Sequence, residues 1–388
     1  MINFEDTETA FATKSNAQLR KAYYMFKMVA NQSLVSLGKM ATSIANTLGL
    51  PIKSLVKKTV YEQFVGGENI DECEKIIELL ANYNVKSLLD YSVEGKETEQ
   101  DFEHTKNRLI DTIRFGGKHE AVPFAVFKVT GLARFALLEK VSKGELLSEK
   151  ETKEWLKAKG RVKEICQQAH ENKLAVLIDA EESWIQQAID DLAEEMIRHY
   201  NRERVIVFNT LQMYRVDRLG YLKKLVDLAN KENFYLGVKL VRGAYMEKER
   251  ARARQMGYPS PIQPDKESSD RDFDAGVEYV VENLEKGRLV AGSHNQESCR
   301  KLVDLMKNNN IEPSDHRIWF SQLYGMSDHL SFNLAKAGYN VVKYLPFGPV
   351  KDTLPYLIRR AEENTSASGQ TSRELLLIQK EMRRRGID

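Results

Sequence analysis

Short apolar segments alternate with longer amphipathic ones along most of the chain. The short segments are rich in Val, Ile, Leu and Phe; they lie at residues 85–94, 123–130, 174–181, 204–210, 235–241, 288–294, 317–322 and 340–348. Such nearly continuous apolar strands are typical of a parallel sheet that is covered on both faces. Eight of them, spread over about 280 residues, match a (β/α)8 barrel of the TIM type in size.

The amphipathic segments that follow the strands have apolar residues at helical spacing. The clearest lie at residues 184–200, 215–231, 272–285 and 352–363. The structural alternative is a doubly wound open sheet, which carries a glycine-rich dinucleotide turn after its first strand. No G-x-G-x-x-G segment occurs in the chain. The pattern therefore favours an α/β fold built on a closed barrel.

Helical patterns with few strand signals occupy the two ends of the chain. Residues 18–29 and 71–83 predict amphipathic helices, and residues 371–385 predict a terminal helix with a basic end. The basic stretches could contact a membrane surface, but a solvated helix face and the helix dipole explain them more simply. We expect three parts, namely an N-terminal helical arm over residues 1–84, a barrel domain over 85–366 and a C-terminal helical tail over 367–388.

One segment breaks the alternation between the fifth strand and the fifth helix. Residues 250–271 are charged and contain prolines. This composition predicts a long loop. The loop would lie on the face formed by the C-terminal ends of the strands, where barrel proteins carry their functional loops.

Composition and charge place the chain among soluble globular proteins. Of its 388 residues, 42% are hydrophobic and 29% are charged, which is ordinary for such proteins. The formal net charge of +2 gives no global field that would recruit nucleic acid, so no nucleic-acid partner is expected. No apolar run reaches the roughly 20 residues that a membrane-spanning helix needs.

The cysteines and the N-terminus predict a compartment. Cys73, Cys166 and Cys299 are isolated and odd in number, which matches neither a disulfide framework nor a zinc site. The first residues, MINFEDTETAF, are acidic where a secretory or mitochondrial targeting segment would be basic. We therefore expect a cytoplasmic protein in a reducing environment.

Polar residues follow almost every predicted strand. In a barrel the C-terminal ends of the strands meet on one face, where the active site lies. The residues at these ends are Lys128, Asp179, Glu181, Gln212, Lys239, Arg242, His294, Asn295, Gln322 and Tyr344. Any one of them could make only a local hydrogen bond, but their convergence indicates a site. The carboxylates of Asp179, Glu181 and Glu182 could bind a hard cation, yet a pair between one of them and Lys128 across adjacent strands is simpler. No paired His, Cys or Asp spacing indicates a metal site.

Two further motifs supply positive charge. Arg359 and Arg360 lie one turn after Tyr356 on the last barrel helix, and paired guanidinium groups suit a carboxylate or a phosphate. A solvated basic patch paired with the glutamates that follow is the alternative. In residues 239–245 (KLVRGAY), a glycine directly after a cation lets the backbone approach a bulky ligand. A phosphate-handling sugar enzyme would share this second motif.

Six separated segments together resemble the proline dehydrogenase family. They occur in the order found in that family, and weaker similarity extends over residues 85–366. The segments are 176–182 (VLIDAEE), 210–214 (TLQMY), 239–245 (KLVRGAY), 293–295 (SHN), 322–326 (QLYGM) and 344–360, which ends in YLIRR. The resemblance implies a distorted, FAD-binding (β/α)8 barrel that oxidises L-proline to Δ1-pyrroline-5-carboxylate by hydride transfer to the flavin.

The resemblance also implies roles for residues by position. Arg359 and Arg360 match the pair that holds the proline carboxylate, while Lys128 and Asp179 match a charged pair that closes the other side of the pocket. The wall around the ring corresponds to Tyr245, Leu323, Tyr344 and Tyr356. The flavin contacts correspond to Gln212, Lys239, Val241, Arg242, Gly243, Ala244, His294, Asn295, Gln322 and Glu363.

Two details bear on the flavin and on substrate choice. Bifunctional bacterial relatives read Arg-Leu-Val-Lys where this chain reads Lys239-Leu-Val-Arg242, so the resemblance makes Lys239 the cation nearest the reactive flavin nitrogen. The bulky phenol of Tyr344 leaves little room for a ring hydroxyl, which favours proline as the substrate. Hydroxyproline stays the alternative.

The family implies partners beyond the substrate. Electrons pass to a membrane quinone, which implies peripheral contact with the inner membrane. The product passes to a separate pyrroline-5-carboxylate dehydrogenase, because the chain is too short for a fused one. Two other functions stay open: an aldolase-type barrel with Lys128 as an amine nucleophile, and a barrel that binds proline through Arg359 and Arg360 without turnover.

Overall fold

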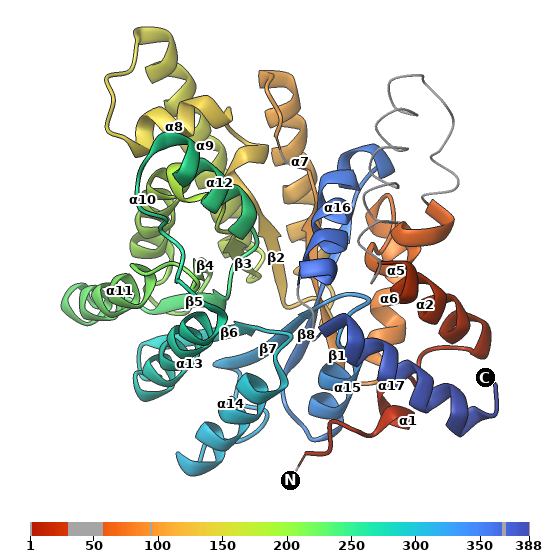
Figure 1. The fold of residues 1–388 in the computed structure, drawn as a ribbon. Coiled ribbons are helices and arrows are strands. Elements are labelled where there is room, and N and C mark those ends of the chain that lie inside the picture. The colour runs from red at the N-terminus through yellow and green to blue at the C-terminus, as the bar shows by residue number, and fades with distance from the viewer. Residues whose placement is uncertain (1, 30–56, 94, 367–369, 388) are drawn as a thin grey trace, which may run out of the picture. The chain divides into compact units, whose positions relative to one another are not determined.

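Eight parallel strands close into a barrel in chain order, from β1 to β8 (Figure 1). The computed structural model describes residues 2–29, 57–93, 95–366 and 370–387. The strands are β1 (Val85–Tyr91), β2 (Phe124–Phe127), β3 (Ala175–Ile178), β4 (Val207–Gln212), β5 (Leu236–Val241), β6 (Gly287–Gly292), β7 (Ile318–Leu323) and β8 (Val341–Phe347). Each overlaps a predicted strand, so the barrel prediction is confirmed and the open sheet is excluded.

The chain forms two compact units, one of residues 88–321 and one of residues 1–87 together with 322–388. The first unit contains strands β2 to β6 and their helices. These helices are α7 (Glu99–Gly116), η2 (Val129–Gly131), α8 (Phe135–Ser142), α9 (Glu149–Glu171), α10 (Ser183–Tyr200), α11 (Arg218–Glu232), α12 (Met246–Met256), α13 (Lys266–Glu282) and α14 (Gln296–Asn308). Figure 1 shows α10, α11, α13 and α14 on the outer side of the strands. In-register pairs such as Val126 with Leu177 and Thr210 with Lys239 bring neighbouring strand ends to the same level.

The prediction of a long loop over residues 250–271 is wrong for most of that segment. Helix α12 extends to Met256 and helix α13 begins at Lys266, so the loop is limited to residues 257–265. All three prolines of the segment fall within this loop. The residues before these prolines are mostly Ala, Arg, Glu, Gln and Lys, which all have high helix propensity. They therefore form α12 in spite of their charge.

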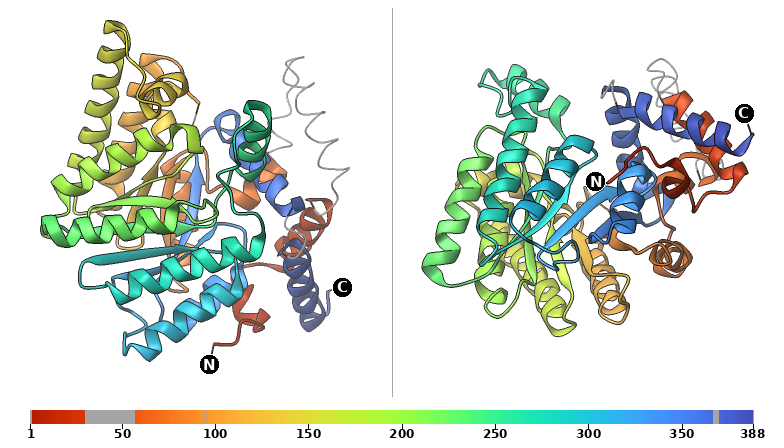
Figure 2. Two further views of the ribbon diagram at one scale, coloured as in Figure 1. Left: turned by 60° about the vertical axis from the view of Figure 1, so that its left-hand side comes forward. Right: turned by 90° about the horizontal axis from the view of Figure 1, so that it is seen from below.

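The second unit holds both ends of the chain. Its helices are α1 (Thr7–Ala10), α2 (Asn16–Val29), η1 (Lys57–Tyr61), α5 (Glu62–Phe64), α6 (Ile70–Ala81), α15 (Asp328–Lys336), α16 (Val350–Ser366) and α17 (Gln370–Arg385). The predicted helices at both ends are therefore present. Helices α2 and α17 lie side by side, as Figures 1 and 2 show.

A separate apolar core joins the two ends of the chain. Buried side chains from α2 and α5 pack with buried side chains from α16 and α17, and we call this group the arm core. Its members include Leu19, Phe26, Phe64, Met326, Tyr356, Leu377 and Ile378. The C-terminal arginines reinforce it, because the guanidinium group of Arg385 donates to Phe11 O over 2.9 Å and to Lys14 O over 2.7 Å. No helix in the described ranges combines the length and the apolar character that crossing a membrane requires.

Candidate active site

A buried aspartate lies between two lysines at the C-terminal ends of the strands. Asp179 follows β3, and its Oδ1 lies 2.5 Å from Lys239 Nζ on β5, while its Oδ2 lies 3.3 Å from Lys128 Nζ after β2. Thr210 on β4 donates a hydrogen bond to Asp179 Oδ1 over 3.3 Å. Because buried charges are costly unless paired, one carboxylate that serves two ammonium groups makes a tightly constrained site. The pair between Asp179 and Lys128 expected from the sequence is confirmed.

Glu181 ties the end of β3 to the turn after β2. Its carboxyl group accepts hydrogen bonds from Thr130 N over 3.0 Å and from Thr130 Oγ1 over 2.5 Å. The side chain is almost completely buried. Burial, followed by repulsion from Glu182, raises the pKa of Glu181 to about 8, although Thr130 and Lys128 act in the opposite direction. Glu181 is thus a mainly neutral acid near pH 7, and it fixes the turn that follows Lys128.

Gln212 connects the ends of β3, β4 and β5. Its Nε2 donates to Glu181 O over 2.7 Å, and its Oε1 accepts from Ala244 N over 3.1 Å. Gly243 has φ 148°, and a Cβ at this position would come within 2.5 Å of the Tyr214 ring. The backbone of the turn after β5 is therefore held by an amide side chain and can accept only glycine at its tightest point.

Arg242 joins β5 to the segment after β6. Its guanidinium group donates to Asp270 over 2.5 Å, to Ser293 Oγ over 2.9 Å and to Ser298 Oγ over 2.8 Å, and it lies 4.5 Å above the Phe273 ring. These contacts use the planar fork of donors that distinguishes arginine from lysine. Val241, which precedes it, accepts a hydrogen bond from Met213 N through its carbonyl group.

His294 and Asn295 directly follow β6. Asn295 is the N-cap of α14, and its Oδ1 accepts from Glu297 N over 2.9 Å and from Ser298 N over 3.3 Å. Capping by Asn satisfies backbone N–H groups that have no partner in the first turn of a helix. His294 is half-buried beside this cap. The two residues thus lie at the start of a helix, where the dipole is positive.

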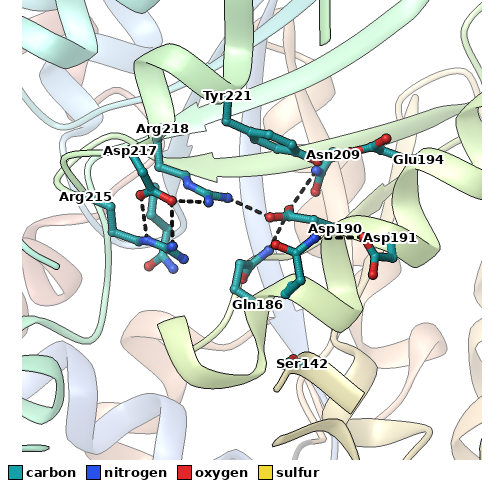
Figure 3. A network of polar contacts seen from close by, with 12 residues as sticks. Ser142, Gln186, Asp190, Asp191, Glu194, Asn209, Arg215, Asp217, Arg218 and Tyr221 are labelled. Carbon is teal, nitrogen blue, oxygen red and sulfur yellow. Dashed lines mark hydrogen bonds and ion pairs between the residues drawn. The ribbon is translucent and has the colours of Figure 1, made fainter. Parts of the chain in front are cut away.

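A buried polar network joins α10 to β4 and α11 (Figure 3). Asp190 of α10 accepts from Gln186 Nε2 over 3.0 Å, from Asn209 Nδ2 over 3.0 Å and from Arg218 Nη1 over 2.6 Å. Gln186 in turn accepts from the backbone N–H of Glu181 over 2.8 Å. The position of Glu181 is therefore set by a chain of hydrogen bonds that reaches α11.

The remaining candidate residues belong to the unit that holds the chain ends. Gln322 Oε1 accepts from Ser331 Oγ over 2.9 Å, and Tyr344 O accepts from Tyr324 N over 2.9 Å. The guanidinium group of Arg360 lies 5.1 Å from the centre of the Tyr356 ring. The substrate-wall candidates Tyr344 and Tyr356 are buried, Leu323 and Arg359 are half-buried, and the side chain of Glu363 lies outside the described residues.

The structure brings together part of the predicted site directly. Within residues 88–321 it joins Lys128, Asp179 and Lys239, and it links Gln212 to Ala244. Tyr245 is the N-cap of α12 and is buried, with Lys248 Nζ 5.6 Å from its ring. The sequence did not single out Thr210, although it lies in one of the six motifs, because a threonine at a strand end is common.

The family model described as proline dehydrogenase matches residues 73–373. The chain is 30% identical to "Proline dehydrogenase 1, mitochondrial" of Dictyostelium discoideum, over 98% of this chain and 74% of that protein. It is 34% identical to "Carbapenem antibiotics biosynthesis protein CarD" of Pectobacterium carotovorum, over 83% of each. A relative named "Hydroxyproline dehydrogenase", from Xenopus laevis, is 30% identical over 97% of this chain and 88% of that protein.

Solved structures share the fold. Proline utilization A from Bdellovibrio bacteriovorus, inactivated by N-propargylglycine, matches 92% of this chain with a TM-score of 0.70 and 22% identity. The corresponding protein from Bradyrhizobium japonicum, as the mutant D779Y, matches 95% with a TM-score of 0.68. The chain spans 38% and 42% of the lengths of those two solved chains.

The prediction of a cytoplasmic protein is contradicted by the relatives. The proline dehydrogenases of Dictyostelium discoideum, Caenorhabditis elegans, Homo sapiens and Arabidopsis thaliana that match this chain are all named mitochondrial. The prediction depended on an acidic N-terminal segment and isolated cysteines. Those two features do not determine the compartment.

Proposed function

Because the chain belongs to the proline dehydrogenase family and is an oxidoreductase, we propose that it oxidises L-proline to Δ1-pyrroline-5-carboxylate with FAD as the hydride acceptor. The observation that carries the proposal within the fold is the group at the strand ends formed by the buried Asp179 and Lys239 with the half-buried Lys128. Ionisable groups that are buried together in this way are concentrated at catalytic sites, and the C-terminal face of a barrel is where such sites lie.

The residues at the ends of β4 to β6 fit a flavin. A flavin needs hydrogen-bond donors along its ring edge and positive charge near the atoms that become electron-rich on reduction. Lys239 supplies a buried cation, and Gly243 keeps the turn after β5 free of a side chain. When bound, FAD supplies the acceptor for the hydride. The residues proposed to hold it are Gln212, Lys239, Val241, Arg242, Gly243, Ala244, His294, Asn295, Gln322 and Glu363.

The proline carboxylate is proposed to bind Arg359 and Arg360. Paired guanidinium groups match a carboxylate in charge and geometry, and the contact between Arg360 and the Tyr356 ring orients one of them. Lys128 and Asp179 would orient the substrate by charge, while the ring is held by shape against Tyr245, Leu323, Tyr344 and Tyr356. Fixing both the carboxylate and the ring would present the carbon beside the nitrogen in a reactive pose.

Proline is favoured over hydroxyproline because Tyr344 is buried. It is 6% exposed, and a bulky phenol in the wall leaves little space for a ring hydroxyl. Hydroxyproline is the second candidate substrate, because the relative from Xenopus laevis is named hydroxyproline dehydrogenase.

The electrons are proposed to pass to a membrane quinone, which requires transient contact with the membrane that contains it. The product would go to a separate pyrroline-5-carboxylate dehydrogenase. We also propose that residues 85–366 form the catalytic barrel domain, with residues 1–84 as a helical arm and residues 367–388 as a helical tail.

An anaerobic titration of the purified protein with L-proline tests the function. We expect flavin absorbance in the visible range to bleach as L-proline is added. Bleaching with hydroxyproline but not with L-proline would show that hydroxyproline is the substrate. A protein that stays colourless and unresponsive after FAD is added would contradict the dehydrogenase and support a proline-binding barrel. A product trapped on Lys128 by borohydride would support the aldolase type.

The variant Arg359→Ala tests the carboxylate contact. Loss of a charge-assisted pair should weaken proline binding by about 2 to 5 kcal/mol, while FAD stays bound because the contact is made to substrate. The measurement is the proline concentration that half-reduces the flavin, with flavin content measured on the same sample. The exposed Lys351→Ala is the matched control on the same helix. An unchanged proline requirement in Arg359→Ala would remove this assignment.

A further inference from the structure

A buried group of charged residues has no part in the function proposed above. It lies in the unit of residues 1–87 and 322–388. Its buried members are Asp328 at the start of α15, Lys343 on β8 and Glu374 on α17, and the half-buried Lys14 before α2 completes it. We call it the Lys343 cluster. Burying charges costs free energy that apolar side chains would not cost. We therefore examined which backbone groups the cluster contacts.

Lys343 holds the turn between β7 and α15, which comprises residues 323–327. The lysine is fully buried, and its Nζ lies 2.8 Å from Asp328 Oδ1. It donates to Met326 O over 2.6 Å and lies 3.5 Å from Leu323 O. An ammonium group has three protons, and these three oxygens account for them. β8 therefore fixes both the beginning and the end of the turn.

Glu374 holds the last residue of the same turn. Its Oε1 accepts a hydrogen bond from Ser327 N over 2.5 Å. Ser327 has φ 51°, a left-handed conformation that is uncommon for a residue with a side chain. Such a conformation is strained and persists only where the surroundings impose it. Glu374 supplies that constraint from the C-terminal helix.

A third contact comes from the N-terminal arm. Gln63 on α5 donates from Nε2 to Gly325 O over 2.8 Å. Gly325 has φ 78°, and a Cβ there would collide with Gln63 O. The turn is thus held from β8, from α17 and from α5.

Two residues of the proposed site lie at the beginning of the turn. Leu323, proposed for the substrate wall, is its first residue and packs against the arm core. Gln322, proposed for the flavin, precedes the turn and accepts from Ser331 Oγ, while Ser331 N donates to Ser327 O. A shift of Ser327 would therefore move Leu323 and, through Ser331, Gln322.

We propose that Glu374 is a positioning residue for the substrate pocket: by accepting the hydrogen bond from the Ser327 N–H, it fixes the 323–327 turn and, with it, Leu323. The proposal rests on the proposed function. It assigns the C-terminal helix a part in proline binding, although the helix lies outside the catalytic barrel domain in sequence.

The carboxyl group of Glu374 can accept the hydrogen bond from Ser327 N whether it is ionised or protonated. Burial and the Asp328 carboxylate raise the pKa of Glu374 to about 7, while Ser327 and Lys343 act to lower it. His329 is neutral, because burial and then Arg373 lower its pKa to about 3. Within the cluster Lys14 pairs with Asp328, and Arg373, which precedes Glu374 on α17, pairs with Glu5.

The test compares Glu374→Ala, Glu374→Leu and Glu374→Gln in the holoenzyme. The amide oxygen of glutamine can still accept from Ser327, whereas leucine keeps the volume without an acceptor. We expect the KM for L-proline to rise about 5- to 20-fold in the Ala and Leu variants, with kcat within about twofold, as expected for a lost hydrogen bond in a buried site. The Gln variant should keep the wild-type KM.

Glu381→Ala is the matched control on the same helix. Glu381 is also fully buried, but it pairs with Arg384 and Arg385. Its loss should lower the melting temperature without changing the KM. Hydrogen exchange at the Ser327 amide is measured on every variant and should accelerate with Ala and Leu but not with Gln.

The outcomes separate the two proposals. Faster exchange at Ser327 with an unchanged KM would overturn the positioning role, and so would an equal rise of KM in Glu381→Ala. If Ala fails to fold, the Leu variant gives the same comparison. If wild-type protein is not reduced by L-proline, the proposed function fails. In that case unchanged exchange in the Glu374 variants would additionally refute the contact itself.

Discussion

The carboxyl group of Glu181 shows how one buried residue can give the whole protein a pH dependence. Burial raises its pKa from an ordinary value of 4.5 to about 8. The folded protein therefore binds this proton more tightly than the unfolded chain does. The stabilisation of the folded protein by this tighter proton binding is complete below pH 4.5 and is lost as the pH rises through about 8.

Glu181→Gln should remove this pH dependence, because an amide has no proton to lose. Between pH 5.5 and 7.5 the unfolding free energy of the wild type should fall by about 1.4 kcal/mol per pH unit from this residue. Urea unfolding at three pH values measures the slope, with the exposed Glu120→Gln as control. Equal slopes in wild type and Glu181→Gln would refute the raised pKa.

At the residue scale, the sequence predicted which side chains lie at the strand ends but not all of their partners. A pair between Lys128 and a carboxylate after β3 was predicted because β2 and β3 are consecutive, and the family resemblance implied that this carboxylate is Asp179. Lys239 was assigned to the flavin, and its 2.5 Å contact with Asp179 was not predicted. The strand pattern gives the level of a residue along the barrel axis, whereas the partner depends on side-chain direction and on burial.

At the scale of elements, apolar runs were a sufficient guide to the strands. All eight were predicted because a strand that is buried on both faces needs an unbroken apolar sequence. Helix α12 was missed because charge was taken as a sign of a loop, although its residues are strong helix formers. The six motifs predicted the family, and the family match over residues 73–373 confirms it.

Gly243→Ala tests how the turn after β5 depends on its backbone. A Cβ at this position would meet the Tyr214 ring at 2.5 Å, in addition to the cost of φ 148°. We expect a loss of about 1 to 3 kcal/mol of stability and weaker FAD binding, since the turn carries proposed flavin contacts. FAD binding to the apoprotein is measured by fluorescence quenching.

Gly257→Ala is the matched control for this substitution. Gly257 has φ 71°, but nothing lies within 4 Å of its Cβ position. Its replacement should cost about 1 kcal/mol and leave FAD binding unchanged. The assignment of the turn to the flavin would be wrong if both variants bound FAD equally well.

At the scale of the whole molecule, the arm core makes the two ends of the chain depend on each other. Leu377 is 3% exposed and belongs to this core, whereas its neighbour Leu376 is 64% exposed. The sequence predicted the terminal helices but not their association, because amphipathic patterns show a buried face without naming what covers it.

Leu377→Ala should destabilise the unit that holds both chain ends by about 2 to 5 kcal/mol, because it leaves a cavity in the arm core. Leu376→Ala should change the stability by less than about 0.5 kcal/mol. Thermal unfolding of both variants measures the difference. Similar melting temperatures would show that the arm core contributes little to the fold.

The contact between Arg385 and Phe11 spans 374 positions of the chain, and this separation has a consequence for biosynthesis. The ribosome makes residues 88–321 between the two parts of the unit to which both residues belong. At 5 to 20 residues per second, this takes about 10 to 50 s. During that interval the newly made arm carries exposed apolar side chains such as Phe26 and Phe64, without the helix that will cover them. Chaperone binding to the nascent chain should therefore concentrate on the arm and end when α17 leaves the ribosome.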